Sequence, residues 1–311
     1  MSDKKRVIVI VGPTASGKTA LGVLLGTALS GEVVSADSMQ IYKNMPIASA
    51  APSVEEMCSV PHHLIGFAEP SHSFSVAEYV SLAEKTIDDV FKRGKTPIIV
   101  GGTGLYVDSL VSGVKFEEEN NSEVRNELET EADNLGIEVL FERLKSADPD
   151  TAAKLHLNDR KRIIRALEVL KIHGKTFSEM KRLSKADGPR YDAIWIGITY
   201  KDRQKLYDRI NRRVDIMLQN GLIDEAKEAY KTSGATAVQA IGHKELFGVF
   251  TGETDLNSAV EQLKMETRRY AKRQMTWFRK NSEINWIYAD ETEDVLKEVL
   301  KIIGERTGDK E

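Results

Sequence analysis

The feature that most constrains this chain is a glycine-rich turn that joins an apolar strand to a helix near the N-terminus. Residues 6–11 are RVIVIV, and GPTASGKT follows at residues 12–19. The pattern GxxxxGKT after a strand is typical of anion-binding loops, because backbone N–H groups and the helix N-terminus surround a phosphate there. A tight turn without a ligand explains the glycines but not the lysine. We therefore predict a phosphate-binding loop made of Gly12, Pro13, Thr14, Ala15, Ser16, Gly17, Lys18, Thr19 and Ala20.

Short β-branched runs recur along the chain and predict a parallel sheet. Helical patterns lie between them, at about residues 17–29 and 75–93. Nearly continuous apolar runs are typical of parallel strands that are buried on both faces. The expected fold class is α/β, a P-loop-type parallel sheet flanked by helices. The runs are RVIVIVG at 6–12, GEVVSAD at 31–37, KTPIIVGG at 95–102, YDAIWIGITY at 191–200 and INWIYAD at 284–290.

After Gly113 the sequence becomes charged and helical in its periodicity. In RIIRALEVLKIHG, residues 162–174, the apolar positions recur at helical spacing and form one face. This change predicts an inserted all-helical domain at 115–192. It would divide the α/β core into a first part, 1–114, and a second part, 193–311, that ends in a basic helix.

The net charge of −4 conceals an uneven distribution of charge. Residues 117–150 carry twelve acidic and three basic side chains, whereas residues 154–190 carry eleven Lys and Arg against four acids. Residues 264–280 hold seven basic side chains and one acid. Two cationic segments on an otherwise anionic chain favour a polyanionic partner.

Other classes of protein are disfavoured by composition. No apolar run approaches the roughly 18 residues of a membrane span, and no cleavable leader follows the charged start, so we expect a soluble cytoplasmic protein. A single cysteine, Cys58, excludes an internal disulfide and a cysteine-rich zinc site. We expect packing roles for the adjacent His62 and His63.

The phosphate loop alone does not decide whether a nucleotide binds. An NTPase usually has a second apolar strand that ends in a Mg2+-orienting acid, but the strand near residue 100 ends in Gly101–Gly104. Ligands of parallel sheets bind beyond the carboxyl ends of the strands, so Asp37 and this turn are expected to flank the phosphate pocket. Asp37 is either a helix cap or Asx turn, or a general base that faces an acceptor. The polar DSMQ segment, residues 37–40, favours the base.

Six segments together resemble the bacterial tRNA dimethylallyltransferase (tRNA isopentenyltransferase) family, and the likeness covers nearly the whole chain in order. The resemblance implies transfer of a dimethylallyl group from dimethylallyl diphosphate to the N6 amine of the adenosine 3'-adjacent to the anticodon of tRNA. A cytoplasmic monomer is expected. The segments are GPTASGKT at 12–19, SADSMQIY at 35–42, GGTGLY at 101–106, NDRKRIIRALEV at 158–169, AIGHKEL at 240–246 and TRRYAKRQMTWFR at 267–279.

The same resemblance implies the catalytic residues. Lys18, the loop amides and Mg2+ held by Thr19 would neutralise the departing diphosphate, which explains why no second carboxylate is needed. Asp37 would accept the proton of the amine. Arg209 and Arg213, four apart on a helix, would close over the diphosphate opposite Lys18; the alternative is a solvated helix face.

The implied partner is the tRNA anticodon stem-loop, whose target base must leave its stack. The basic positions around residue 162 lie at helical spacing beside the apolar face, and a solvated helix is their alternative. At 264–280 we favour a packed helix with a basic side that touches RNA over an aromatic stacking platform. The predicted tRNA-binding residues are Asp37, Ser38, Met39, Gln40, Thr103, Arg125, Lys161, Arg162, Ile163, Ile164, Arg165, Gln239, Ala240, Ile241, Gly242, His243 and Lys244.

Several positions depart from the family pattern. Residues 48–52 are ASAAP where the family often has GTAKP, so a lysine contact is lost. Gly66 stands where the family commonly has an Asp, so a role of that Asp in binding Mg2+ cannot be performed by residue 66 in this chain. Leu157 replaces a frequent proline and His243 a frequent tyrosine, changes that concern helix entry and RNA contact.

Two other functions remain open from the residues. In a small-molecule P-loop kinase of the shikimate-kinase type, Asp37 would activate a hydroxyl, and Arg209 and Arg213 would be lid arginines. The other alternative is an RNA-binding NTPase without transferase activity.

Overall fold

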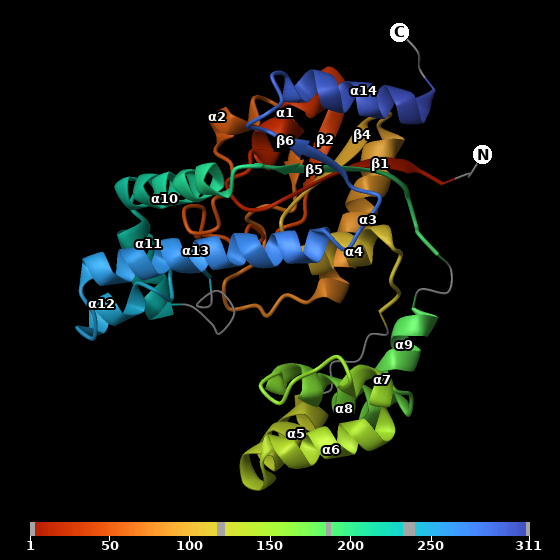
Figure 1. The fold of residues 1–311 in the computed structure, drawn as a ribbon, viewed down its shortest axis with the longest axis vertical. Coiled ribbons are helices and arrows are strands. Elements are labelled where there is room, and N and C mark those ends of the chain that lie inside the picture. The colour runs from red at the N-terminus through yellow and green to blue at the C-terminus, as the bar shows by residue number, and fades with distance from the viewer. Residues whose placement is uncertain (1–3, 117–121, 185–187, 233–239, 309–311) are drawn as a thin grey trace. The chain divides into compact units, whose positions relative to one another are not determined.

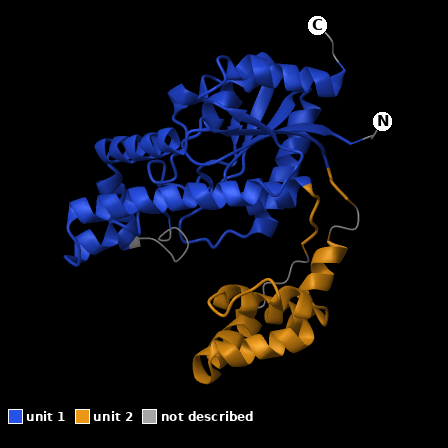
Figure 2. Ribbon diagram, viewed as in Figure 1, with its two compact units in different colours: residues 1–111, 191–311 blue, residues 112–190 orange. Residues whose placement is uncertain are grey.

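The computed structural model describes residues 4–116, 122–184, 188–232 and 240–308. The chain divides into two compact units (Figure 2). Unit 1 contains residues 1–111 and 191–311, and unit 2 contains residues 112–190.

Unit 1 is built on a six-stranded sheet with the order β3-β2-β4-β1-β5-β6. Every strand pair is parallel, so the predicted α/β fold with a parallel sheet is confirmed. The central strands β1, β2, β4 and β5 bury most of their residues, which explains their continuous apolar character, whereas the edge strands β3 and β6 are only partly buried. Their bounds are β1 Arg6–Val11, β2 Gly31–Ser35, β3 His62–His63, β4 Thr96–Val100, β5 Asp192–Thr199 and β6 Asn285–Tyr288.

Helices cover both faces of this sheet (Figure 1). On one face, Ile8, Ile10 and Ile196 pack with Leu25 of α1 and Ile303 of α14. On the other side, α3 and α4 pack together through stacked rings of Tyr79 and Tyr106, 4.1 Å apart. The helices of unit 1 are α1 Lys18–Ala28, α2 Val54–Met57, α3 Val76–Lys92, α4 Gly104–Val111, α10 Arg203–Gln219, α11 Leu222–Thr232, α12 Phe247–Thr251, α13 Leu256–Phe278 and α14 Val295–Thr307.

The two helices predicted at 17–29 and 75–93 are confirmed as α1 and α3. Helix α3 begins at a capping box, in which Ser75 accepts a bond from the Glu78 N–H and the Glu78 carboxylate accepts one from the Ser75 N–H. Helix α1 begins instead after Gly17, whose φ of 103° lies in the left-handed region and which offers no side-chain cap. Its first amides are therefore left for a ligand.

The described part of unit 2 contains only helices. Its core contains Leu140, Leu144, Ile163, Ile164 and Leu167. Among the described residues of the whole chain, none of the helices combines the length and apolar character that crossing a membrane requires. The helices of unit 2 are α5 Ser122–Leu135, α6 Ile137–Ala147, α7 Pro149–Ala152, α8 Arg160–His173 and α9 Phe177–Leu183.

Candidate active site

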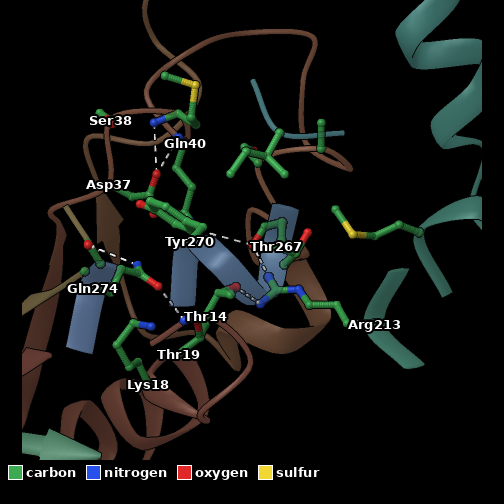
Figure 3. Close-up of a pocket in the computed structure, with 18 of the residues that line it drawn as sticks. Thr14, Lys18, Thr19, Asp37, Ser38, Gln40, Arg213, Thr267, Tyr270 and Gln274 are labelled. Atoms are coloured by element: carbon green, nitrogen blue, oxygen red, sulfur yellow. Dashed lines mark hydrogen bonds between the residues drawn. The ribbon is translucent and has the colours of Figure 1, made fainter. Parts of the chain in front are cut away.

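A cavity of about 370 Å³ lies at the carboxyl ends of β1, β2 and β4. Its wall combines the phosphate loop, the segment after β2 and the turn after β4, and α10 and α13 complete it (Figure 3). Segments far apart in the sequence therefore converge on one space. This is the place at which ligands of open parallel sheets bind.

The phosphate loop is held in a backbone conformation that requires glycine. At Gly12, φ is +146° and an added Cβ would lie 2.1 Å from the Ile198 carbonyl oxygen. Lys18 Nζ donates to the Pro13 carbonyl at 2.7 Å across the loop. Ser16 Oγ is buried and makes no hydrogen bond to the described residues. A loop with a free buried hydroxyl and an inward-facing lysine is suited to an anion.

The charge of Lys18 depends on its surroundings. Burial first, and then the charge of Arg213, lower the pKa of Lys18, while Asp37 opposes them, and the net result is a pKa of about 7. A polyanion in the cavity would stabilise the ammonium form, because opposite charges at short range favour ionisation.

Two arginines of α10 contact the phosphate loop, and Arg213 also lines the cavity. Arg209 Nε donates to the Ala15 carbonyl at 2.9 Å. Arg213 Nη1 donates to Thr14 Oγ1 at 3.2 Å, and Nη2 to the Ala50 carbonyl at 3.3 Å. The structure thus brings both predicted arginines to the phosphate loop, and their action on a diphosphate stays a prediction.

The geometry of Asp37 is compatible with both roles that the sequence left open, an Asx turn and a general base. Its Oδ1 accepts bonds from the Met39 N–H at 2.9 Å and the Gln40 N–H at 3.4 Å, which is an Asx turn. Its Oδ2 makes no hydrogen bond to the described residues, and the side chain lines the cavity. The turn therefore fixes the carboxylate while one oxygen stays available.

The turn after β4 supports the segment that carries Asp37. Thr103 Oγ1 accepts a bond from the Ser38 N–H at 2.9 Å and donates to Ser38 Oγ at 3.2 Å. Tyr270 of α13 lies beside Asp37 in Figure 3. Burial, and then the Asp37 charge, raise the pKa of Tyr270, so its phenol stays protonated at neutral pH.

The glycines of this turn are explained by their neighbours. An added Cβ would lie 2.1 Å from the Ala36 oxygen at Gly101, 2.2 Å from Gln274 Nε2 at Gly102 and 2.3 Å from the Trp277 ring at Gly104. Helix α13 therefore packs directly onto the turn.

Gln274 is a site residue that the sequence argument missed. Its side chain is buried at 5% exposure, accepts a bond from the Thr14 N–H at 2.8 Å and donates to the Gly102 carbonyl at 3.0 Å. A signal was available, because Gln274 falls on the buried stripe of α13 with Leu263, Ala271 and Phe278. A glutamine at such a position needs partners.

The remaining residues of α13 agree with a packed helix that has a basic outer side. Trp277 Nε1 donates to Asp108 Oδ2 of α4 at 2.7 Å. Lys272, Arg273 and Arg279 are exposed. Contact of this side with RNA stays a prediction.

Of the predicted tRNA-binding residues in unit 1, those that line the cavity are Asp37, Ser38, Met39, Gln40, Ile241 and Lys244. His243 requires a correction, because its side chain is 0% exposed and its Nε2 lies 2.9 Å from Glu225 Oε1. It supports the Glu225 carboxylate instead of facing a partner. Ala240 is also buried, and Gln239 lies outside the described residues.

Glu225 in turn holds a wall of the cavity. Its two oxygens accept bonds from the Ile47 and Ala48 N–H groups, each at 2.8 Å. Ala48 lines the cavity. The tyrosine-to-histidine departure from the family pattern at residue 243 therefore concerns the scaffold of the site.

In unit 2, the structure separates the predicted tRNA-binding residues into two groups. Ile163 and Ile164 are fully buried in the core of the unit, which corrects the prediction that their side chains contact RNA. The exposed group is basic: Arg162 is 70% exposed with Asp159 at 3.9 Å, and Arg165 Nη1 lies 2.9 Å from Glu168 Oε2. Lys161 and Arg125, both exposed, complete it, whereas Arg165 is only partly exposed.

A resident metal site is not evident in the described part of the chain. No group of three or more His, Cys, Asp or Glu side chains there is arranged to hold an ion. Thr19 and Asp37 both line the cavity. Mg2+ in phosphate sites commonly keeps several waters and uses one or two protein oxygens with the substrate phosphates. The donor set therefore fits a Mg2+ that binds together with a diphosphate.

Comparison with known proteins gives matches to one family along nearly the whole chain. The family model described as IPP transferase matches residues 40–281, and that described as Isopentenyl transferase matches residues 5–65. A relative named tRNA dimethylallyltransferase, from Thermoanaerobacter sp. (strain X514), is 45% identical over 306 residues, 96% of this chain and 97% of the relative.

Solved structures agree as well. The crystal structure of the full-length tRNA isopentenylpyrophosphate transferase from Bacillus halodurans is 42% identical, with a TM-score of 0.72 over 98% of this chain and 96% of that one. A eukaryotic dimethylallyltransferase described as acting on tRNA is 29% identical, with a TM-score of 0.83 over 98% of this chain and 79% of that one.

The fold, the cavity and these matches define the class, which is that of α/β prenyltransferases. The chain belongs to the IPP transferase family, as its sequence motifs predicted. The relatives are transferases on tRNA, which supports this interpretation and not the small-molecule kinase alternative.

Proposed function

We propose that the protein transfers the dimethylallyl group from dimethylallyl diphosphate to the N6 amine of the adenosine 3'-adjacent to the anticodon of tRNA, and releases diphosphate. The observation that carries the proposal is that the phosphate loop and the free oxygen of Asp37 share one cavity. A leaving-group site and a proton acceptor are what this substitution at carbon requires. The family membership supports the same reaction.

The phosphate loop acts on the leaving group. As the bond between the allylic carbon and the diphosphate oxygen breaks, negative charge grows on the diphosphate. The Lys18 ammonium and the loop amides lie where they can neutralise that charge, and Arg213 extends the positive wall. Preorganised donors of this kind usually supply the largest single contribution to catalysis. Mg2+ held by Thr19 would add a further positive charge on the diphosphate oxygens.

Asp37 acts on the nucleophile. The new bond joins the allylic carbon to N6 of adenine, and the amine must lose one proton, which Asp37 Oδ2 accepts. The Asx turn fixes the carboxylate, so it does not have to be ordered when the substrates bind. A positioned base of this kind typically accelerates a reaction about 10²–10⁴-fold.

The proposed RNA partner is the anticodon stem-loop. The exposed cations of α8 and α13 are suited to its phosphates, and the polar DSMQ segment at the cavity would receive the extruded adenine. We expect the protein to act as a monomer.

An assay with labelled dimethylallyl diphosphate and a tRNA transcript tests the proposal. Label is expected in a transcript with adenosine 3' of the anticodon and absent from a matched transcript with guanosine at that position. ATP hydrolysis without prenyl transfer would support an RNA-binding NTPase instead. Phosphorylation of a small acceptor without any use of tRNA would support a kinase.

A further inference from the structure

We infer that Gln274 is a positioning residue, which ties the diphosphate loop to the turn that supports the acceptor side of the cavity. This inference rests on the proposed function. Gln274 joins the phosphate loop after β1 to the turn after the neighbouring strand β4 through one carboxamide (Figure 3). Its oxygen accepts from the Thr14 N–H at 2.8 Å, and its nitrogen donates to the Gly102 carbonyl at 3.0 Å.

The orientation of this carboxamide is fixed by its partners. A backbone N–H can only donate and a carbonyl can only accept, so the two ends of the amide cannot be exchanged. The side chain is 5% exposed, which leaves little water to replace either bond. Loss of a partner would leave buried backbone groups unsatisfied.

Each end of the carboxamide adjoins a part of the reaction. Thr14 belongs to the phosphate loop and also binds Arg213 through its hydroxyl. Gly102 precedes Thr103, which binds Ser38 beside Asp37. One side chain therefore sets the separation between the leaving-group donors and the segment that carries the base. Reacting groups must be held within a few tenths of an ångström for efficient transfer.

The glycine at position 102 belongs to the same arrangement. A Cβ there would lie 2.2 Å from Gln274 Nε2, so the lack of a side chain at position 102 leaves room for the carboxamide. Packing alone would not need a carboxamide at position 274, whereas a link between a donor and an acceptor does.

Two substitutions separate positioning from packing. Gln274→Met keeps the approximate volume but can make neither bond, so the transfer rate at saturating substrates should fall about tenfold to a hundredfold. In Gln274→Glu, a protonated carboxyl group can accept from Thr14 and donate to Gly102, whereas a carboxylate can only accept. The ratio of the Gln274→Glu rate to the wild-type rate should therefore decline as pH rises. Titratable groups that share this cavity contribute to both profiles, so the ratio is the measurement; they are Lys18, Asp37, Arg213, Lys244, Tyr270 and Arg273.

Binding of inorganic diphosphate with Mg2+ provides a readout that does not depend on transfer. Gln274→Met should weaken it roughly tenfold, because the Thr14 end of the loop loses its anchor. Gln262→Met, on the exposed side of the same helix, is the matched control and should change neither quantity. If the wild-type protein bound diphosphate but did not modify tRNA, the proposed function would fail and this binding arm would still test Gln274.

A folded Gln274→Met variant with wild-type transfer rate and diphosphate affinity would overturn the inference. So would a Gln274→Glu rate ratio that stays constant with pH. Should Gln274→Met fail to fold, the Gln274→Glu ratio decides the question alone.

Discussion

At the scale of single residues, the two oxygens of Asp37 have separate tasks. Oδ1 closes the Asx turn, and Oδ2, which makes no hydrogen bond to the described residues, is the proposed proton acceptor. Asp37→Asn keeps an oxygen for the turn but removes the proton acceptor, so the single-turnover rate should fall by about a hundredfold or more. Affinity for tRNA should stay within a few-fold of wild type.

Asp37→Ala is the informative companion to that substitution, because it removes the turn as well. We expect it to lose the same activity and also some thermal stability, which differential scanning calorimetry would measure. A wild-type single-turnover rate in Asp37→Asn would remove the carboxylate from the mechanism.

The sequence pattern identified site residues whose partners are close along the chain, and site residues that belong to a known motif. Lys18, Thr19 and Asp37 fall in this group, and the structure places them on one cavity. Gln274 was missed because its partner Thr14 lies 260 positions away, a contact that no local pattern predicts. His243 was misassigned because its partner Glu225 lies on another element, 18 positions earlier.

At the scale of elements, strands and helices with strong periodicity could be predicted from the sequence. The order of strands could not, because it depends on crossovers that place β4 between β2 and β1. The packing of α13 onto the glycine turn could not be predicted from the sequence either. The apolar stripe of this helix predicted a packed helix. The glycines of the turn did not indicate which residues pack against them, and the structure shows that Trp277 and Gln274 do.

Helix α8 allows RNA contact to be separated from stability. Arg162 is 70% exposed, so Arg162→Ala should change the free energy of unfolding by no more than about 0.5 kcal/mol. If α8 binds tRNA phosphates, the same substitution should weaken tRNA binding and reduce its salt slope by about 1. Unchanged binding and slope would reject this helix as an RNA surface.

Arg165 is not an equivalent test, because it accompanies a buried acid. Glu168 is 2% exposed and has Arg165 as its cation. Arg165→Ala should therefore destabilise unit 2 by about 2 kcal/mol, an effect moderated by the partial exposure of the arginine. Chemical denaturation measures this, and the double variant Arg165→Ala/Glu168→Leu should recover much of the loss. A fully stable Arg165→Ala variant would contradict the pairing.

The edge of the sheet carries a pH-dependent contribution to stability. Glu32 of β2 accepts two bonds from Arg93, at 2.6 and 3.1 Å, and lies 2.6 Å from His63 of β3. These hydrogen bonds, that of Arg93 first, lower the pKa of Glu32. A carboxyl group whose pKa is lower in the folded state stabilises the fold above its unfolded pKa of 4.5 and loses that contribution as pH falls through the folded value.

Substitution of Arg93 tests that contribution. Arg93→Ala should lower the free energy of unfolding at pH 7, because the Glu32 carboxylate loses both hydrogen bonds from its cationic partner. The difference from wild type should shrink as pH falls below about 4.5. Lys92→Ala, on an exposed side chain of the same helix, is the control. A difference that is independent of pH would show that Arg93 acts through packing and not through the Glu32 charge.

At the scale of the whole molecule, the proposed reaction site and the proposed RNA-binding helix α8 belong to different units. Unit 1 has the sheet, the phosphate loop and Asp37, and every described residue that lines the cavity belongs to it. Unit 2 has its own core and a basic helix. Since the cores are separate, substitutions inside one unit should leave the stability of the other nearly unchanged.

The division can be tested by excision of residues 112–190. The two ends of unit 2 lie side by side, since a Cβ added at Gly113 would be 3.2 Å from the Arg190 Cβ. A short glycine-serine linker can therefore join Val111 to Tyr191. The shortened protein should unfold cooperatively and bind Mg2+-diphosphate within a few-fold of wild type, because every residue of the phosphate loop is kept. Its affinity for tRNA should fall at least tenfold as the cations of α8 are lost. Full tRNA affinity would place recognition in unit 1, and loss of diphosphate binding would show that the loop depends on unit 2.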